Sequence, residues 1–119
     1  VDEPFAEGTA NGRGFAVSGG VANAVKQCIQ KEHPDKEVLI DSAEGLKNCK
    51  TMLMMAKAGK RNGYLLEGMA CPGGCVAGAG TLQPVMKSSA LVKKYTNEAE
   101  KKLAFESEYL ENLALITKE

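Results

Sequence analysis

Apolar residues recur at steps of three and four along residues 19–32, which predicts an amphipathic helix there. Ser18 precedes this stretch with a hydroxyl that can cap the helix. Pro34 disfavours helical backbone at His33, so the helix is expected to end there, with His33 as a solvated cap residue. The apolar stripe consists of Val21, Ala24, Val25, Cys28 and Ile29.

A second helix is predicted over residues 43–58, with Ser42 as its cap and Gly59 as its stop. Cys28 in the first helix and Cys49 in the second are expected to be core thiols. The apolar face of the second helix is expected to carry Leu46, Cys49, Leu53 and Ala56, with Met52, Met54 and Met55 filling the core.

Short apolar runs at 37–41 and 64–69 flank the second helix and predict two strands, and 15–17 predicts a shorter one. The 22 residues between the runs at 37–41 and 64–69 suit a right-handed crossover, so these two strands are expected to be parallel. Residues 1–13 are predicted to form a loop. Beyond Leu82 the pattern predicts a long helix capped by Thr81 or Ser88, with a break at 103–107.

These elements predict one α/β domain over residues 1–119, a small parallel βαβ unit flanked by helices and followed by a helical C-terminal tail. A chain of 119 residues is expected to bury a real core. Fifteen basic residues balance fifteen acidic ones, which argues against binding to nucleic acid or an anionic membrane. The sequence contains no membrane-spanning run and no apolar leader, so we expect a reducing, cytoplasmic location.

The most informative segment reads Glu-Gly-Met-Ala-Cys-Pro-Gly-Gly-Cys-Val-Ala-Gly-Ala-Gly over residues 67–80. Cys71 and Cys75 follow the second strand, at the end of a parallel sheet where sites usually lie. The Pro-Gly-Gly spacer prevents a helix and lets the backbone approach a ligand closely. Thiolates are the standard ligands of iron–sulfur clusters, so we expect both cysteines to bind one.

Three alternatives stay open for this cysteine pair. A tight glycine-rich turn can contain two buried thiols that bind nothing. Zinc prefers four ligands, and no second pair or nearby histidine is present in the sequence. A redox dithiol would use a two-residue spacer rather than the three residues found here.

The segment Met-Ala-Cys-Pro-Gly-Gly-Cys resembles the last cysteine motif of the catalytic, H-cluster domain of iron-only ([FeFe]) hydrogenases. The resemblance implies that Cys71 binds a [4Fe–4S] cubane, while Cys75 binds the cubane and bridges to a [2Fe] subcluster. Met69 would lie beside the two-iron site, and Pro72, Gly73 and Gly74 would wrap the cluster.

A second glycine-rich segment, residues 12–21, resembles the family's Phe-Gly-Ala-Thr-Gly-Gly-Val stretch, with Ala-Val-Ser in place of Gly-Ala-Thr. Phe15 would supply an apolar wall. The amides of Gly19 and Gly20 would face anionic ligands from a helix N-terminus. The alternative reading of these glycines is an ordinary capped helix start.

The resemblance implies the C-terminal part of a hydrogenase that catalyses reversible proton reduction with electrons from a ferredoxin-type carrier. The family's other cysteine motifs, Thr-Ser-Cys-Cys-Pro and Met-Pro-Cys-x-x-Lys, are absent, so this chain is expected to bind no complete cluster and to be inactive alone. Its expected partner is the N-terminal remainder of the domain, and an exposed apolar face can support a homodimer. Rival hypotheses are an iron–sulfur sensor or assembly factor without hydrogenase activity, and an interaction domain with idle cysteines.

Overall fold

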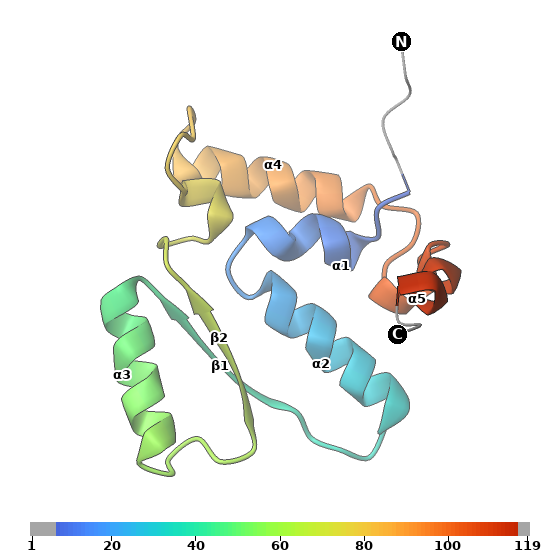
Figure 1. The fold of residues 1–119 in the computed structure, drawn as a ribbon. Helices are drawn as coiled ribbons and strands as arrows, with labels where there is room; N and C mark the ends of the chain where they lie inside the picture. The colour runs from blue at the N-terminus through green and yellow to red at the C-terminus, as the bar shows by residue number, and fades with distance from the viewer. Residues whose placement is uncertain (1–6, 117–119) are drawn as a thin grey trace.

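The computed structural model describes residues 7–116, with side chains described as far as residue 113. Figure 1 shows helices arranged around two strands. The elements run in the order α1 (Ala10–Arg13), η1 (Gly14–Ala16), α2 (Gly20–Glu32), β1 (Leu39–Glu44), α3 (Leu46–Lys57), β2 (Tyr64–Met69), η2 (Cys75–Ala77), α4 (Val85–Asn97), η3 (Ala104–Glu106) and α5 (Leu110–Ile116), where η marks a 3-10 helix.

The strands β1 and β2 pair in parallel, with Leu39 opposite Tyr64 and Glu44 opposite Met69. The predicted α/β class with a small parallel sheet is therefore confirmed, and β2 has the predicted bounds. The first strand was predicted too early, at 37–41. Its polar second half pairs with β2, and Gly45, at a φ of 78°, then turns the chain into α3.

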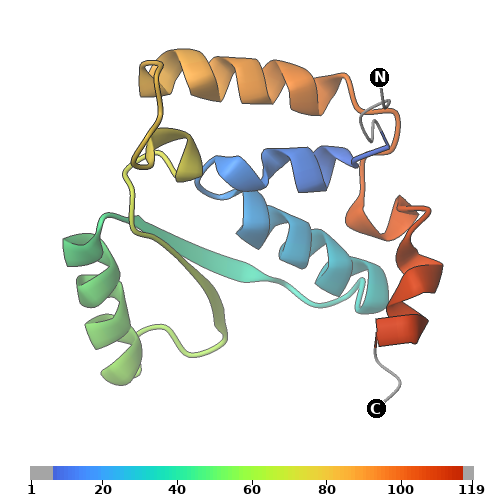
Figure 2. The ribbon, with the colours of Figure 1, turned by 45° about the horizontal axis from the view of Figure 1, so that its top comes forward.

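Helices α3 and α2 lie on opposite sides of the strands in both views (Figures 1 and 2). Helix α3 approaches the sheet through Cys49 and Met52, because Gly68 leaves room there: a Cβ at Gly68 would lie 3.3 Å from the Cys49 Sγ. The predicted face of α3 was wrong in part, since Leu46 and Leu53 are 75% and 60% exposed. Of the three methionines, Met52 is buried and Met54 is exposed.

Residues 7–16 are more ordered than their sequence predicted, and residues 1–6 of the predicted loop lie outside the described part of the chain. Thr9 accepts a hydrogen bond from the Gly12 amide and caps α1, and residues 14–16 form η1 rather than a strand. Buried Asn11 joins distant elements: its Nδ2 donates to the Gln27 side chain at 2.7 Å, and its Oδ1 accepts from the Ala104 amide at 2.8 Å. Helix α1 thereby links α2 to the segment before α5.

The C-terminal part is helical, as predicted, but its long helix is shorter than expected. Helix α4 begins after Pro84, not near Leu82, and ends at Asn97, well before the predicted break at 103–107. Neither Thr81 nor Ser88 caps it. Figure 2 shows α4 lying alongside α1, with α5 next to the far end of α2.

The hydrophobic core is thin, contrary to the expectation from chain length. The buried apolar residues of the described chain are Ala22, Ala24, Ala43, Met52, Val76 and Ala99, so four of the six are alanines. The radius of gyration is 16.4 Å, against about 13.5 Å for a compact chain of this length. The molecule is consequently more open than an ordinary domain of its size.

Candidate functional site

The loop that contains both cysteines leaves the carboxyl end of β2 and makes a tight turn. The Gly74 amide donates to the Cys71 carbonyl at 2.9 Å, and Gly73 and Gly74 have φ values of 95° and 94°. Cys71 is half-buried and Cys75 is exposed at the start of η2. The turn therefore carries two thiols, free of disulfides, at the edge of the sheet.

Close packing around this loop explains its glycines. A Cβ at Gly74 would lie 2.6 Å from the Ser18 amide nitrogen and 2.8 Å from the Ala16 carbonyl oxygen. A Cβ at Gly73 would lie 2.8 Å from a methyl group of Val85. The cysteine loop thus packs tightly against the η1–α2 connection and the first turn of α4.

Both polar groups of the Gly73 backbone have partners. Its amide donates to Glu44 Oε2 at 2.8 Å, and its carbonyl accepts from the Ser18 amide at 3.2 Å. Glu44 is the last residue of β1 and lies next to the end of β2. The loop is therefore fixed from one side by a strand and from the other by the glycine-rich segment.

Glu67 holds the start of α2. Its side chain, in a residue only 8% exposed, accepts from the Gly19 amide at 2.5 Å and from the Ala22 amide at 3.0 Å. The predicted cap, Ser18, makes no side-chain cap bond, since Gly19 is the N-cap residue with a left-handed φ of 87°. The Glu67 side chain therefore anchors the backbone where α2 begins.

The amides of Gly19 and Gly20 do not point outward to a ligand as expected. Gly19 donates to Glu67, and Gly20 donates to the Val17 carbonyl at 3.0 Å. The anion at this helix N-terminus is the protein's own carboxylate, which suits the positive end of the helix dipole. Any contribution of these glycines to a ligand site must come from the shape of the backbone.

The structure brings the two predicted site segments together. Met69 ends β2 half-buried, and its carbonyl accepts from the Gly45 amide at 2.8 Å. Phe15 lies in η1, 44% exposed, and Pro72 is exposed at the tip of the cysteine loop. Glu44 is the contributor that sequence reasoning missed; the signal available was a carboxylate near the end of the neighbouring strand.

The other two cysteines lie elsewhere and are half-buried. The Cys49 Sγ is 3.5 Å from the Ala43 carbonyl and 3.6 Å from the Met69 carbonyl, on the α3 side of the sheet. His33 is exposed at the C-cap of α2, as predicted. Within residues 7–116, no three His, Cys, Asp or Glu side chains come together as a metal site.

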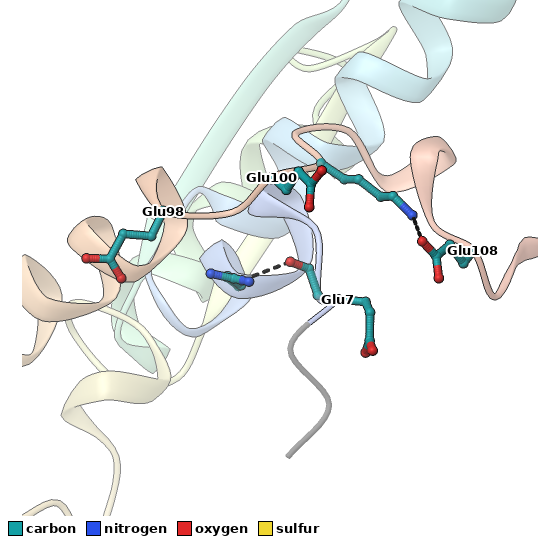
Figure 3. A pocket seen from close by; sticks show the side chains of 7 residues that line it. Glu7, Glu98, Glu100 and Glu108 are labelled. Carbon is teal, nitrogen blue, oxygen red and sulfur yellow. Dashed lines mark hydrogen bonds and ion pairs between the residues drawn. The ribbon is translucent and has the colours of Figure 1, made fainter. Parts of the chain in front are cut away.

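A separate acidic hollow of about 280 Å³ lies where the N-terminal segment meets the segment after α4. Figure 3 shows Glu7, Glu98, Glu100 and Glu108 around it. An ion pair from Lys101 to Glu108 and a hydrogen bond from Arg13 to the Gly8 carbonyl bridge its walls. Neither cysteine of the loop lines this hollow, so it does not extend the cysteine site.

The fold and the site define an α/β unit with a pair of free thiols on a glycine-rich loop at the carboxyl end of a parallel sheet. A family model for the iron only hydrogenase large subunit, C-terminal domain, matches residues 1–79, and the chain belongs to this family. The matched part ends within the glycine-rich tail of the cysteine loop. No curated protein matches the sequence. No helix in the described part of the chain is long and apolar enough to cross a bilayer.

Proposed function

We propose that this chain supplies two cysteine ligands, Cys71 and Cys75, to the catalytic iron–sulfur cluster of an iron-only hydrogenase. The observation that carries the proposal is the turn itself, in which two adjacent glycines at positive φ place a half-buried and an exposed thiol at the end of β2. A [4Fe–4S] cluster takes four cysteine ligands. Two thiols on one loop fit half of that donor set.

The remaining site residues then form one wall of the cluster cavity. Met69 supplies a polarisable side chain beside the loop, and Phe15 supplies an apolar surface from η1. The backbone of Pro72, Gly73 and Gly74 wraps the cluster, while Gly19 and Gly20 shape the floor against which the loop packs. In this arrangement Cys71 would hold the [4Fe–4S] part of the H-cluster, and Cys75 would be a ligand of both the [4Fe–4S] and the [2Fe] parts.

When bound, the H-cluster supplies the redox chemistry of reversible proton reduction. This chain's residues orient two thiolates and limit access of water from one side. The other two cluster ligands come from the N-terminal remainder of the domain, and a ferredoxin-type carrier delivers the electrons. The isolated chain is therefore inactive as a hydrogenase.

The test is anaerobic reconstitution with iron and sulfide of the chain alone and of the chain mixed with the family's upstream lobe, followed by electron paramagnetic resonance after reduction. We expect a [4Fe–4S] signal in the mixture only, lost in Cys71→Ser and in Cys75→Ser. Cys28→Ser is the matched control and should keep the signal. An unchanged signal in the Cys71→Ser and Cys75→Ser variants would refute the ligand assignment.

The mixture also separates the alternative function. An iron–sulfur sensor or assembly factor would form the cubane in the mixture but produce no hydrogen after loading with a two-iron subcluster. Hydrogen production by the loaded wild-type mixture, measured by gas chromatography, would instead support the hydrogenase. Failure to bind iron in every sample would favour an interaction domain with unused cysteines.

A further inference from the structure

Two carboxylates on one face of the sheet form a set of links around the cysteine loop. Glu67 in β2 pairs in register with Ser42, and Glu44 in β1 pairs with Met69, so both glutamates lie on the same side of the two strands. Glu67 accepts from Gly19 and Ala22, and Glu44 accepts from Gly73.

The links close into a ring. Glu67 in β2 accepts a hydrogen bond from the Gly19 amide, and the adjacent Ser18 amide donates to the Gly73 carbonyl. The Gly73 amide in turn donates to Glu44 in β1, and β1 pairs with β2. Gly73 lies between Cys71 and Cys75. Displacement of the α2 start or of either carboxylate therefore shifts the backbone that joins the two thiols.

Hydrogen bonds with one charged partner are stronger than neutral ones, and burial strengthens them further. Glu67 is nearly buried, so its loss leaves two backbone donors of the first turn of α2 without this acceptor. The Glu67→Gln substitution would keep the shape and one acceptor oxygen but would place an amide N–H₂ against a backbone N–H. Its effect should be intermediate between wild type and Glu67→Ala.

We infer that Glu67 is a positioning residue that fixes the relative placement of the Cys71 and Cys75 thiols through the α2 start, with Glu44 as the second anchor of the same ring. This inference rests on the proposed function for its biological meaning. The placement itself can be tested without iron, sulfide or the upstream lobe.

The first measurement is amide hydrogen exchange of the reduced chain by nuclear magnetic resonance. Glu67→Gln and Glu67→Ala should speed exchange at Gly19 and Ala22, by about tenfold or more in Glu67→Ala, since they remove a charged acceptor. Glu44→Gln should speed exchange at Gly73 while leaving Ala22 protected. Glu37→Gln, at an exposed position outside the ring, is the matched control and should change none of them.

The second measurement is titration with Cd²⁺, followed by the cadmium–thiolate absorption, because this ion reports on how well two thiolates are placed. The absorption that is lost in Cys71→Ser and Cys75→Ser is assigned to cadmium bound by the two thiols of the loop. We expect its apparent Kd to rise about tenfold in Glu67→Ala, less in Glu67→Gln, and not at all in Glu37→Gln.

Unchanged exchange at Gly19 and Ala22, or an unchanged cadmium Kd, in a folded Glu67→Ala variant would overturn the inference. Far-ultraviolet circular dichroism shows whether Glu67→Ala folds. If it does not fold, Glu44→Gln is tested by the same two measurements, amide exchange and cadmium titration. Failure of the wild-type mixture to form a [4Fe–4S] cluster would refute the proposed function, while the cadmium comparison would still decide whether Glu67 places the thiols.

Discussion

At the residue scale, the cysteine loop depends on backbone geometry that glycine alone provides. Gly74 has φ 94° and ψ −162°, a region that other residues scarcely enter, and its α-carbon faces the Ala16–Ser18 backbone at close range. The sequence identifies this loop well because cysteine indicates a possible metal ligand, while proline and glycine indicate particular backbone conformations. The sequence did not identify Glu44, because its partner Gly73 lies 29 residues away.

Gly74→Ala should therefore destabilise the chain by about 3 kcal/mol or more, as backbone strain and a collision with the Ser18 amide add together. Gly80→Ala is the matched control: Gly80 also has a positive φ, of 87°, but a Cβ there meets nothing within 4 Å. It should cost only about 1–2 kcal/mol. Urea unfolding followed by circular dichroism measures both. Equal losses of unfolding free energy in the two variants would show that the contact with Ser18 does not affect stability.

At the scale of elements, prediction succeeded for α2 and β2, but it misplaced the ends of α4 and β1 and missed the aperiodic segments. Helix α2 and strand β2 lie within a residue of their predicted bounds, because apolar spacing and the turn residues around them agree. Helix α1 and η1 were missed, since glycine-rich segments carry no periodic signal. Their order comes from distant contacts, such as those of the Ala10 and Asn11 amides with the carbonyls of Lys101 and Lys102.

The η3 turn leads to a prediction of how its stability depends on pH. The amides of Lys102 and Leu103 both donate to Glu106 Oε2 at 2.8 Å, and these backbone hydrogen bonds, with that of Leu103 the larger cause, lower the pKa of the Glu106 carboxyl. A pKa that is lower in the folded state gives stability that is present above the unfolded pKa, about 4.3, and is lost as the pH falls through the folded value.

We therefore expect amide exchange at Lys102 and Leu103 to accelerate as the pH falls below about 4, after correction for the intrinsic pH dependence of exchange. The Glu106 carboxyl should titrate at a lower pH in the folded chain than in the urea-unfolded chain, in a carbon-detected nuclear magnetic resonance titration. Glu106→Gln should remove the pH dependence at both amides. Coincident Glu106 midpoints in the folded and unfolded chains would contradict this account of η3.

At the scale of the whole molecule, the exposed surface is larger than that of a compact monomer of the same mass. The accessible area is 8,850 Å², against about 6,200 Å² for a compact monomer of this mass, an excess of about 2,600 Å². A standard interface covers only about 800 Å² per partner. The sequence could not reveal this openness, because periodicity identifies apolar faces but does not say whether they meet each other or another part of a larger domain.

The outer face of α3 allows a direct test of that surface. Leu46 and Leu53 lie seven residues apart, both well exposed, with exposed Lys50 between them. The wild-type chain should bind a hydrophobic dye and self-associate with concentration in sedimentation velocity, because exposed apolar area of this extent favours association. Leu46→Gln with Leu53→Gln should weaken both without lowering stability by more than about 0.5 kcal/mol per site. Lys50→Gln, on the same helix, should leave association unchanged. A wild-type chain that stays monomeric and binds no dye would show that this face needs no partner.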